Sequence, residues 1–411
     1  MNKGKIAIVV FCSLAILYFF SILHRVGIAV IAFDIMAEFN TDASLLGLMS
    51  SAYFFPYALA QIPVGIMLDR IGIKKTVAIL SSIACVGAFI FSSGSSIFII
   101  SIGRALVGFG VGGFYVSSLK TIAVWFKPRQ FATLAGLLTS IGNIGGIIAS
   151  SPLAILTLAI GWRGAFLGIF FFMLLFTLIA WFVVSDGEDQ CFRSKSSIFN
   201  DLKMVFTKRE FLKIMLIPFF AYGLFISFQG LWGGPFLIDV YGMQKPIASN
   251  FLMLIGIGFA ISGPLAGYLS DKILLKRKPV MLIGLFLSLI FWTIMAAFGN
   301  ALAPPIIYSA FFLLGFAFGF VNIYMTISKE LFTSDIYGTA IACFNTFNFI
   351  GAGLFQYFMG IILDLTFGGS RIFSAYQLIF VICLGGIGIA IVLGLFSKET
   401  LGSAPGDACK A

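Results

Sequence analysis

Long apolar stretches recur along the whole chain, and each has about the 20 residues that a helix needs to cross a bilayer. Hydrophobic residues make up 60% of the 411 residues. Charged residues make up only 10%, whereas soluble domains carry about 25%. The sequence therefore predicts an all-α integral membrane protein.

We predict twelve transmembrane helices. Their approximate ranges are 6–33, 45–68, 76–93, 97–119, 131–156, 164–184, 212–236, 249–269, 279–298, 304–327, 337–362 and 372–396. The first run is too long for a signal peptide and has no small-residue cleavage site, so it is predicted to be a retained span. The longest polar stretch falls between the sixth and seventh runs. The predicted organisation is an N-terminal six-helix bundle (1–184), a cytoplasmic linker (185–211), a C-terminal six-helix bundle (212–398) and a cytoplasmic tail (399–411).

Positive charges are distributed unevenly among the segments between the predicted spans. With the amino terminus placed inside, the inner segments hold 21 of the 26 lysines and arginines, the outer loops hold three, and two lie at membrane depth. Cytoplasmic loops carry an excess of Lys and Arg, so both termini are predicted to be cytoplasmic. This distribution also accounts for the net charge of +10 without a nucleic-acid partner.

The two halves of the sequence resemble each other. GIMLDRIGIKK (65–75) follows the second predicted span and GYLSDKILLKRK (267–278) follows the eighth, so Asp69 and Asp271 are 202 residues apart. WFKPRQFATLAG (125–136) and LFTSDIYGTAIA (331–342) precede the fifth and eleventh spans, displaced by 206 residues. These near-equal offsets predict a duplicated unit, and in transporters built from repeats the binding site lies near mid-membrane.

Three motifs point to one family. The first inner loop matches the pattern G-x3-D-R-x-G-x-[RK]-[RK] through Gly65, Asp69, Arg70, Gly72, Lys74 and Lys75. The other two motifs are RALVGFGVGG (104–113) and GWRGAF (161–166). Across essentially its whole length the chain resembles the major facilitator superfamily, of which the loop is the hallmark. The resemblance implies two pseudo-symmetric six-helix bundles around one central site.

The same resemblance implies a gating role for the inner loops. The candidate gating residues are Gly65, Asp69, Arg70, Gly72 and Lys75, with Asp271 in the second copy, where Leu274 replaces the second glycine. Asp69 can accept hydrogen bonds from a helix amino terminus, while Arg70 and Lys75 hold neighbouring helix ends. The resemblance implies that this network stabilises the outward-facing state. Alternatively, the loop is only a tight turn, and its positive charges reflect the excess of Lys and Arg in cytoplasmic loops.

His24 and Arg25 interrupt the first apolar run, and His24 is the only histidine of the chain. A charge at the centre of a transmembrane helix costs about 2.5 kcal/mol or more, so Arg25 should face the bundle interior unless it snorkels. No carboxylate lies in mid-span, because Asp239 and Asp364 are both at span ends. Arg25 is therefore a candidate to bind a carboxylate or phosphate, which guanidinium grips in a bidentate manner. His24 points about 100° away on the same helix, and a helix contact is its alternative role.

In the superfamily, the first, fourth, seventh and tenth helices line the cavity. The candidate substrate-binding residues are Arg25, His24, Tyr57, Arg104, Lys120, Gln229, Trp232, Asn322 and Asn345. Arg104 could instead form a structural bond to a neighbouring helix or snorkel to the outer interface. Lys120 could instead anchor its helix at the inner membrane surface. QGLWGGP (229–235) is interpreted as a flexible gate helix.

The sequence predicts neither a cofactor nor a metal site. Its six cysteines are scattered, with no CxxC pair and no histidine cluster. GFGVGG (108–113) formally matches GxGxxG, but it lies inside an apolar run, follows no strand and lacks the acidic residue about 20 positions later. Its glycines instead predict close helix contact.

The predicted function is transport of a small polar solute bearing a carboxylate or phosphate, by alternating access. Exchange or facilitated diffusion is favoured over carboxylate-based proton symport, with His24 as the remaining candidate for proton coupling. The resemblance extends to bacterial sugar-phosphate and organic-anion permeases and to the lysosomal dipeptide branch, so a dipeptide uniporter is one alternative. A transporter-like ligand sensor is another, whereas drug efflux and an enzyme are disfavoured. We expect a functional monomer in the bacterial inner membrane, whose partners are its solute and the lipid bilayer.

Overall fold

The computed structural model describes residues 3–186, 198–332, 337–366 and 372–401. Helices dominate these ranges, which contain no strand. Parts of the predicted linker (187–197), of the second repeated loop (333–336) and of the predicted tail (402–411) lie outside the described residues.

The chain divides into two compact units. The N-terminal unit comprises residues 1–41 and 49–195, and the C-terminal unit comprises residues 42–48 and 196–411. The short segment 42–48 therefore groups with the second half of the chain, although it precedes most of the first. The bundle boundaries drawn from the sequence stay a prediction.

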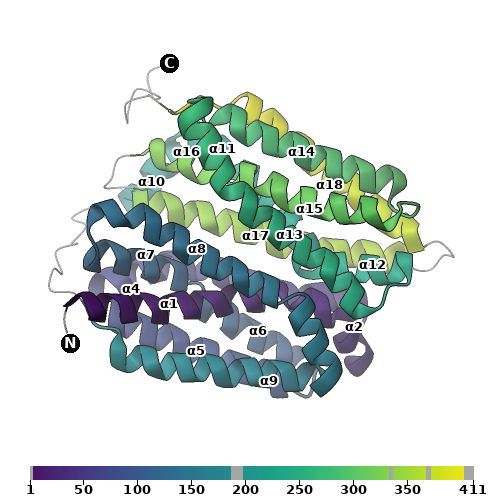
Figure 1. Cartoon of the computed structure of the whole chain (residues 1–411), viewed down its shortest axis with the longest axis horizontal. Helices are drawn as coiled ribbons and strands as arrows, with labels where there is room; N and C mark the ends of the chain where they lie inside the picture. The colour runs from purple at the N-terminus through teal and green to yellow at the C-terminus, as the bar shows by residue number, and fades with distance from the viewer. Residues whose placement is uncertain (1–2, 187–197, 333–336, 367–371, 402–411) are drawn as a thin grey trace. The chain divides into compact units, whose positions relative to one another are not determined.

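Helices of the first half are coloured purple to blue in Figure 1. They are α1 (Lys3–Val26), α2 (Ile28–Phe39), α3 (Ala43–Ser51), α4 (Phe54–Arg70), α5 (Gly72–Ser93), α6 (Ile97–Val111), α7 (Phe114–Trp125), the short η1 (Pro128–Gln130), α8 (Phe131–Ile148) and α9 (Ser151–Val183).

Helices of the second half are coloured teal to yellow in Figure 1. They are α10 (Ile198–Thr207), α11 (Arg209–Ser227), η2 (Phe228–Trp232), α12 (Gly233–Tyr241), α13 (Lys245–Tyr268), η3 (Leu269–Ile273), α14 (Lys278–Phe298), α15 (Pro304–Val321), α16 (Tyr324–Glu330), α17 (Tyr337–Thr366) and α18 (Ile372–Leu395).

Among the described residues, eleven helices are long and apolar enough to cross a membrane, and Thr133–Ile148 is a shorter apolar helix. The fifth and sixth predicted spans meet inside α9. Ser150 separates α8 from α9 with a non-helical backbone (φ −99°, ψ −110°), and hydrogen bonds from Ala149 to Gly145 (2.9 Å) and from Ala154 to Ser150 (3.0 Å) lie on either side of the junction. Gly161 then breaks α9 with φ +74°, a conformation that L side chains rarely adopt. The glycine thus allows the chain to turn back between two spans.

The N-terminal unit packs around α1, which contacts α7, α8 and α9, while α5 packs on α6 and α9. Gly108 of α6 touches the backbone of Tyr53, where a Cβ atom would have no room. The expected close helix contact is therefore confirmed at this glycine, and it brings the α6 backbone against the start of α4.

The C-terminal unit has an aromatic core. Helix α14 packs against α15 and α18, and α11 packs against α17 and α18. At the centre of this core, the ring of Phe228 lies 5.4–6.0 Å from the rings of Phe291, Trp292, Phe311 and Phe380. Edge-to-face packing of this kind adds attraction beyond the burial of apolar area.

Several spans are interrupted part-way along. The N-terminal unit has breaks at Gly27, between α1 and α2, at Ala52–Tyr53, between α3 and α4, and at Gly112–Gly113, between α6 and α7. In the C-terminal unit, the π-helix η2 interrupts the first span, and Asn322–Ile323 separates α15 from α16. Such breaks free backbone groups and side chains for binding, and π-helical turns are frequent at functional sites.

Candidate substrate site

The break after α1 carries the two polar residues of the first span. Arg104 of α6 reaches this break, and its Nη1 donates a hydrogen bond to the backbone oxygen of His24 at 2.7 Å. His24 and Arg104 are fully buried, and Arg25 is only 7% exposed. The Arg104 guanidinium thus binds the end of α1 that carries His24 and Arg25, although Arg104 and His24 are 80 positions apart in the sequence.

Two tyrosines from the start of α4 accompany these cations. The guanidinium carbon of Arg104 lies 4.7 Å from the ring centroid of Tyr53, and that of Arg25 lies 5.1 Å from the ring of Tyr57. The two tyrosine rings are stacked at 5.8 Å. The Tyr53 hydroxyl donates a hydrogen bond to the Ser21 carbonyl at 3.0 Å, which ties α4 to α1. Cation–π attraction thereby partly replaces the hydration that the guanidinium groups lose on burial.

Arg104 has donor capacity to spare. Its Nε and Nη2 find no hydrogen-bond partner among the described residues, and the same holds for both ring nitrogens of His24. A buried donor without a partner costs about 1–3 kcal/mol, and more when it is charged. The cluster therefore favours a ligand that brings hydrogen-bond acceptors and negative charge.

The corresponding breaks in the C-terminal unit carry amides and aromatic rings. Gln229 and Trp232 lie in η2 and are buried, and the indole Nε1 of Trp232 donates to the Gln356 carbonyl at 2.9 Å. Asn322 caps the end of α15 at the second break, and Asn345 lies buried on α17. The described spans of this unit contribute neutral polar groups where the N-terminal unit contributes cations.

Lys120, also predicted to bind substrate, lies at the loop 65–75 of the N-terminal unit, the first of the two predicted inner loops. Its Nζ contacts Asp69 Oδ1 at 2.6 Å and donates to the Leu68 carbonyl at 2.7 Å. Lys120 is thus bound at the end of α4 and does not lie beside Arg25. This position corresponds to its alternative role, that of a helix anchor. Arg70 and Lys75 of the same loop are exposed.

Gly72 of this loop has φ +85°, and the Asp186 carboxylate fills the space that its side chain would need, with Oδ1 2.5 Å from the Cβ position. Asp186 accepts a hydrogen bond from the Lys74 backbone N–H at 3.0 Å. The acid that meets the first turn of α5 thus follows the last span of the unit, a pairing that the loop motif did not reveal. Gly65 has no atom near its Cβ position.

The second inner loop uses different partners. Arg277 contacts both Asp271 and Glu330, the latter at 3.0 Å. Burial lowers the pKa of Arg277, but the hydrogen bonds with Asp271 and Glu330 outweigh this effect and leave its pKa above the ordinary value. Glu399 accepts hydrogen bonds from the backbone N–H groups of Arg277 (2.8 Å) and Lys278 (3.1 Å) at the start of α14. The end of the last described span therefore holds this loop.

The GWRGAF motif has a structural explanation at the opposite end of the N-terminal unit. Arg163 pairs with Glu38 at 2.7 Å and donates to the carbonyls of Ser92 (2.9 Å) and Gly94 (2.6 Å). Trp162 donates to the same Glu38 carboxylate at 2.7 Å. These bonds join the ends of α2 and α5 to the break of α9 at Gly161, so the motif organises helix packing.

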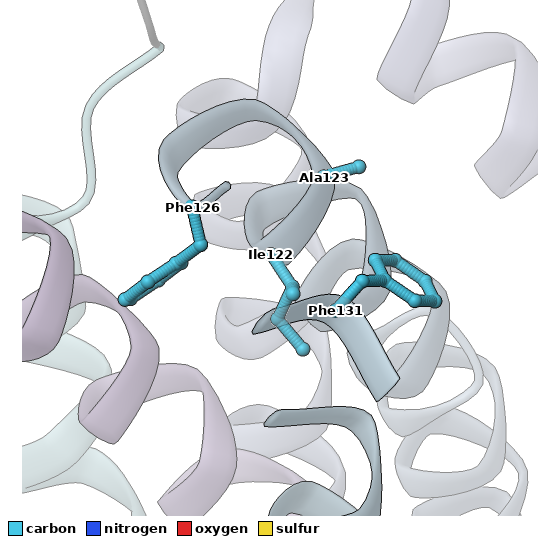
Figure 2. A pocket seen from close by; sticks show the side chains of 4 residues that line it. All are labelled: Ile122, Ala123, Phe126 and Phe131. Atoms are coloured by element: carbon cyan, nitrogen blue, oxygen red, sulfur yellow. The ribbon is translucent and has the colours of Figure 1, made fainter. Parts of the chain in front are cut away.

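An apolar pocket of about 290 Å³ opens between α7 and α8. Figure 2 shows its lining by Ile122, Ala123, Phe126 and Phe131. None of these side chains is polar, and none belongs to the predicted site.

Spans that are broken and carry buried polar residues at their breaks are typical of membrane transporters. The family model of the Major Facilitator Superfamily matches residues 14–355. The chain belongs to this superfamily and is a multi-pass membrane transporter, not an enzyme.

Relatives and solved structures agree with this assignment. The chain is 26% identical to the "Probable sulfoacetate transporter SauU" of Cupriavidus necator, over 94% of this chain and 93% of the relative. It is 26% identical to the hexuronate transporter of Bacillus subtilis, over 70% of this chain and 71% of that one. A bacterial homologue of the human lysosomal transporter Spinster, inward-facing and unoccupied, superposes with TM-score 0.78 at 18% identity, covering 95% of this chain and 97% of the other.

The D-xylose–proton symporter gives the same TM-score, 0.78, at 17% identity, covering 98% of this chain and all of its own. The predicted fold, twelve transmembrane helices in two pseudo-symmetric six-helix bundles, is thereby confirmed.

Proposed function

We propose that this transporter moves a small organic anion, bearing a carboxylate or phosphate, by alternating access. Arg25 and Arg104 of the N-terminal unit bind the anionic group. Tyr57 positions Arg25 through its ring, and Tyr53 positions Arg104. Gln229, Trp232, Asn322 and Asn345 contact the neutral part of the solute.

One observation carries the proposal. Arg104 is fully buried, yet only its Nη1 has a hydrogen-bond partner among the described residues, a backbone carbonyl. No aspartate or glutamate of the sequence lies in mid-span to neutralise it. Because guanidinium binds carboxylate and phosphate through paired N–H donors, an anionic solute satisfies the groups that the protein leaves unbonded.

The relatives support the same class of solute. Besides the sulfoacetate and hexuronate transporters, they include the "Probable galactarate/D-glucarate transporter GudP" of Bacillus subtilis and the sialic acid transporter NanX of Escherichia coli. All of these solutes are organic acids. We place the chain as a monomer in a bacterial inner membrane. Both termini are placed in the cytoplasm, because the predicted inner segments hold 21 of the 26 cationic side chains.

Exchange or facilitated diffusion is the proposed mode, because the spans contain no mid-span carboxylate to carry a proton. The gate comprises Gly65, Asp69, Arg70, Gly72 and Lys75 of the first inner loop, joined by Lys120, with Asp271 in the second. Lys120 joins it because it bonds Asp69 directly.

The test is uptake into proteoliposomes of paired solutes that differ only in the acidic group, such as glucuronate and glucose. We expect the anions to be transported and their neutral counterparts not to be transported. Arg25→Ala should weaken the apparent affinity about 10- to 100-fold, since a hydrogen bond to a charged group contributes roughly 1.5–3 kcal/mol. Arg129→Ala, which removes an exposed arginine in η1, just before α8, is the matched control and should leave uptake unchanged.

Transport of neutral solutes in preference to anions would contradict the proposal, as would unchanged anion preference in Arg25→Ala. A dipeptide uniporter is the alternative, and it would transport zwitterionic dipeptides but not glucuronate. A ligand sensor would bind the anion and fail to move it.

A further inference from the structure

Within the C-terminal unit, two hydrogen bonds hold the π-helix η2 against α17. The hydroxyl of Ser227, the last residue of α11, donates to the Ala352 carbonyl at 3.1 Å. The indole of Trp232, the last residue of η2, donates to the Gln356 carbonyl at 2.9 Å. The two acceptors are four residues apart on α17, which is about one helical turn. Both ends of η2 are therefore fixed to successive turns of α17.

Close backbone packing supports this contact. A Cβ atom on Gly223 of α11 would lie 2.8 Å from the Gly351 carbonyl carbon, and one on Gly351 would collide with the Phe219 carbonyl. Small residues allow transmembrane helices to approach in this way. The backbones of α11 and α17 therefore set where the following residues of α17 lie relative to η2.

The side-chain amide of Gln356 is fully buried at this contact and is not used by the protein. Neither its Oε1 nor its Nε2 has a hydrogen-bond partner among the described residues. Gln61, a buried glutamine of the N-terminal unit, shows the contrast, because its Nε2 donates to the Gly112 carbonyl at the break between α6 and α7, at 3.0 Å. Gln61 thus satisfies backbone that a break leaves free, whereas the amide of Gln356 is left to bind something else.

Unused amide capacity continues along α17. Asn345 and Asn348 precede Gln356 by eleven and eight residues, so the three buried amides fall on one face of the helix. The Oδ1 of Asn348 also has no partner among the described residues, while its Nδ2 lies 3.4 Å from the Tyr324 hydroxyl. Gln356 therefore ends a polar face on an otherwise apolar span.

The position of η2 in the repeat connects this face with solute binding. Gln229 of η2 follows Arg25 by 204 residues, which lies between the offsets of 202 and 206 residues of the repeated loops. The π-helix is therefore the C-terminal counterpart of the break that carries Arg25. In transporters built from repeats, discontinuous helices form the binding site.

The chemistry of an amide selects its partner. An amide offers both donors and an acceptor, whereas an ionised carboxylate only accepts hydrogen bonds and an ammonium group only donates them. A hydroxyl group does both, so neighbouring hydroxyls can bond Oε1 and Nε2 together.

We propose that Gln356 is a specificity-determining residue that binds hydroxyl groups of the solute. The transported anions are accordingly hydroxylated organic acids. The inference rests on the proposed anion transport and adds the neutral group that the C-terminal unit selects. An acid without hydroxyls leaves the buried amide unbonded and binds more weakly for that reason.

Gluconate and hexanoate test the proposal, because both have six carbons and one carboxylate and only gluconate carries hydroxyls. The measurement is equilibrium binding of each acid to the purified full-length protein. We expect the wild type to bind gluconate at least about tenfold more tightly. Gln356→Met keeps the length of the side chain and removes both amide atoms, so it should reduce this preference about tenfold. Its affinity for hexanoate should stay within about twofold.

Gln377→Met is the matched control. It makes the same substitution at an exposed glutamine of α18, whose Nε2 already donates to the Ala296 carbonyl at 2.8 Å. The preference for gluconate should stay within about twofold in this variant. Thermal unfolding without solute reports on the fold, and Gln356→Met should not lower the melting temperature, because an apolar group replaces an amide without partners.

Equal wild-type affinities for the two acids, or a preference that survives in Gln356→Met, would overturn the inference. Sorbitol, which has hydroxyls but no acid, separates it from the proposed function. Sorbitol binding that equals gluconate binding and is weakened by Gln356→Met would contradict anion selection and leave the role of Gln356 standing. Equal binding of both acids that Arg25→Ala abolishes would contradict the role of Gln356 alone.

Discussion

The two units have the same helical plan but different chemistry at their breaks. In the N-terminal unit, Arg104 bonds the carbonyl of His24 at the end of α1, beside Arg25. In the C-terminal unit, the first span is interrupted by the π-helix η2, which presents Gln229 and Trp232. A repeated scaffold thus supplies breaks in both halves, and the side chains at those breaks differ. In the proposed mechanism, charge recognition therefore belongs to the N-terminal unit, and the C-terminal unit contributes neutral contacts.

The inner loops show a similar divergence. Both acids of the repeat are paired, Asp69 with Lys120 and Asp271 with Arg277. Both loops also receive a second acid from beyond the last span of their half, Asp186 in one and Glu399 in the other. The duplicated architecture keeps the electrostatic scheme even where individual residues have changed.

The largest expected effect separates the two units directly. Arg104→Gln should weaken anion binding about 10- to 100-fold, because it removes a charged, buried donor. Asn345→Ala should weaken it only about 2- to 10-fold, corresponding to a neutral hydrogen bond of roughly 0.5–1.5 kcal/mol. Titration of both variants with the same anion measures the difference. Equal losses would show that charge recognition is not confined to the N-terminal unit.

The second prediction concerns the rate of transport. Asp69→Asn should slow transport while leaving ligand affinity unchanged, because Asp69 bonds Lys120 in the inner loop, away from Arg25. Turnover is expected to fall about tenfold, in keeping with roughly 1.4 kcal/mol of lost stabilisation of one state. Counterflow measurements provide the turnover rate, and equilibrium binding provides the affinity. Weaker binding at an unchanged rate would contradict the gating role.

A smaller effect is expected on the stability of the fold, and it depends on the backbone conformation of the two loops. Gly72 has φ +85°, whereas in the second copy Leu275 has φ +48°. Leu275→Gly should raise stability by about 1 kcal/mol, because L residues are penalised by roughly 1–2 kcal/mol in this region. Gly72→Ala should lower stability by more than that, since its Cβ would also strike Asp186. Thermal unfolding in detergent checks both signs, and a destabilised Leu275→Gly would show that the leucine side chain packs productively.

The smallest effect is expected at His24. Its ring nitrogens have no partner among the described residues, and Arg104 bonds its backbone carbonyl, which any residue provides. His24→Gln should therefore keep uptake within about threefold, at the low end of the effect of losing one neutral hydrogen bond. A pH gradient alone should not drive uphill uptake. Gradient-driven uptake that His24→Gln abolishes would instead assign proton coupling to this residue.

Much of the fold could be predicted from the sequence, because hydrophobic length, charge asymmetry and the repeated loop are all local patterns. The turn at Gly161 falls between the fifth and sixth predicted spans, but the positive φ of this glycine was not predicted, since a single glycine carries no signal of its conformation. Two of the predicted site residues, Arg25 and Arg104, lie at the same break because α6 packs near the end of α1, and membrane-depth charge alone singled them out.

The remaining site geometry depends on tertiary contacts that no spacing rule reveals. Tyr53 lies four residues before Tyr57, and that spacing could have suggested a shared helix face. The partners of Asp186 and Gln356 are more than 100 residues away from them in the sequence, so their contacts appear only in the structure. Lys120 could be assigned to the inner loop only once its contact with Asp69 was known.

In the proposed mechanism, the N-terminal cations hold the anionic group of the solute. The most direct test of this mechanism is thermal stabilisation of the purified wild type and of Arg25→Ala by hexuronates, sulfonates and sugar phosphates, each beside its neutral counterpart. We predict that at least one anion stabilises the wild type, that its neutral counterpart does not, and that Arg25→Ala loses the response. Stabilisation by neutral or cationic solutes alone, or an anion response that survives in Arg25→Ala, would contradict the account.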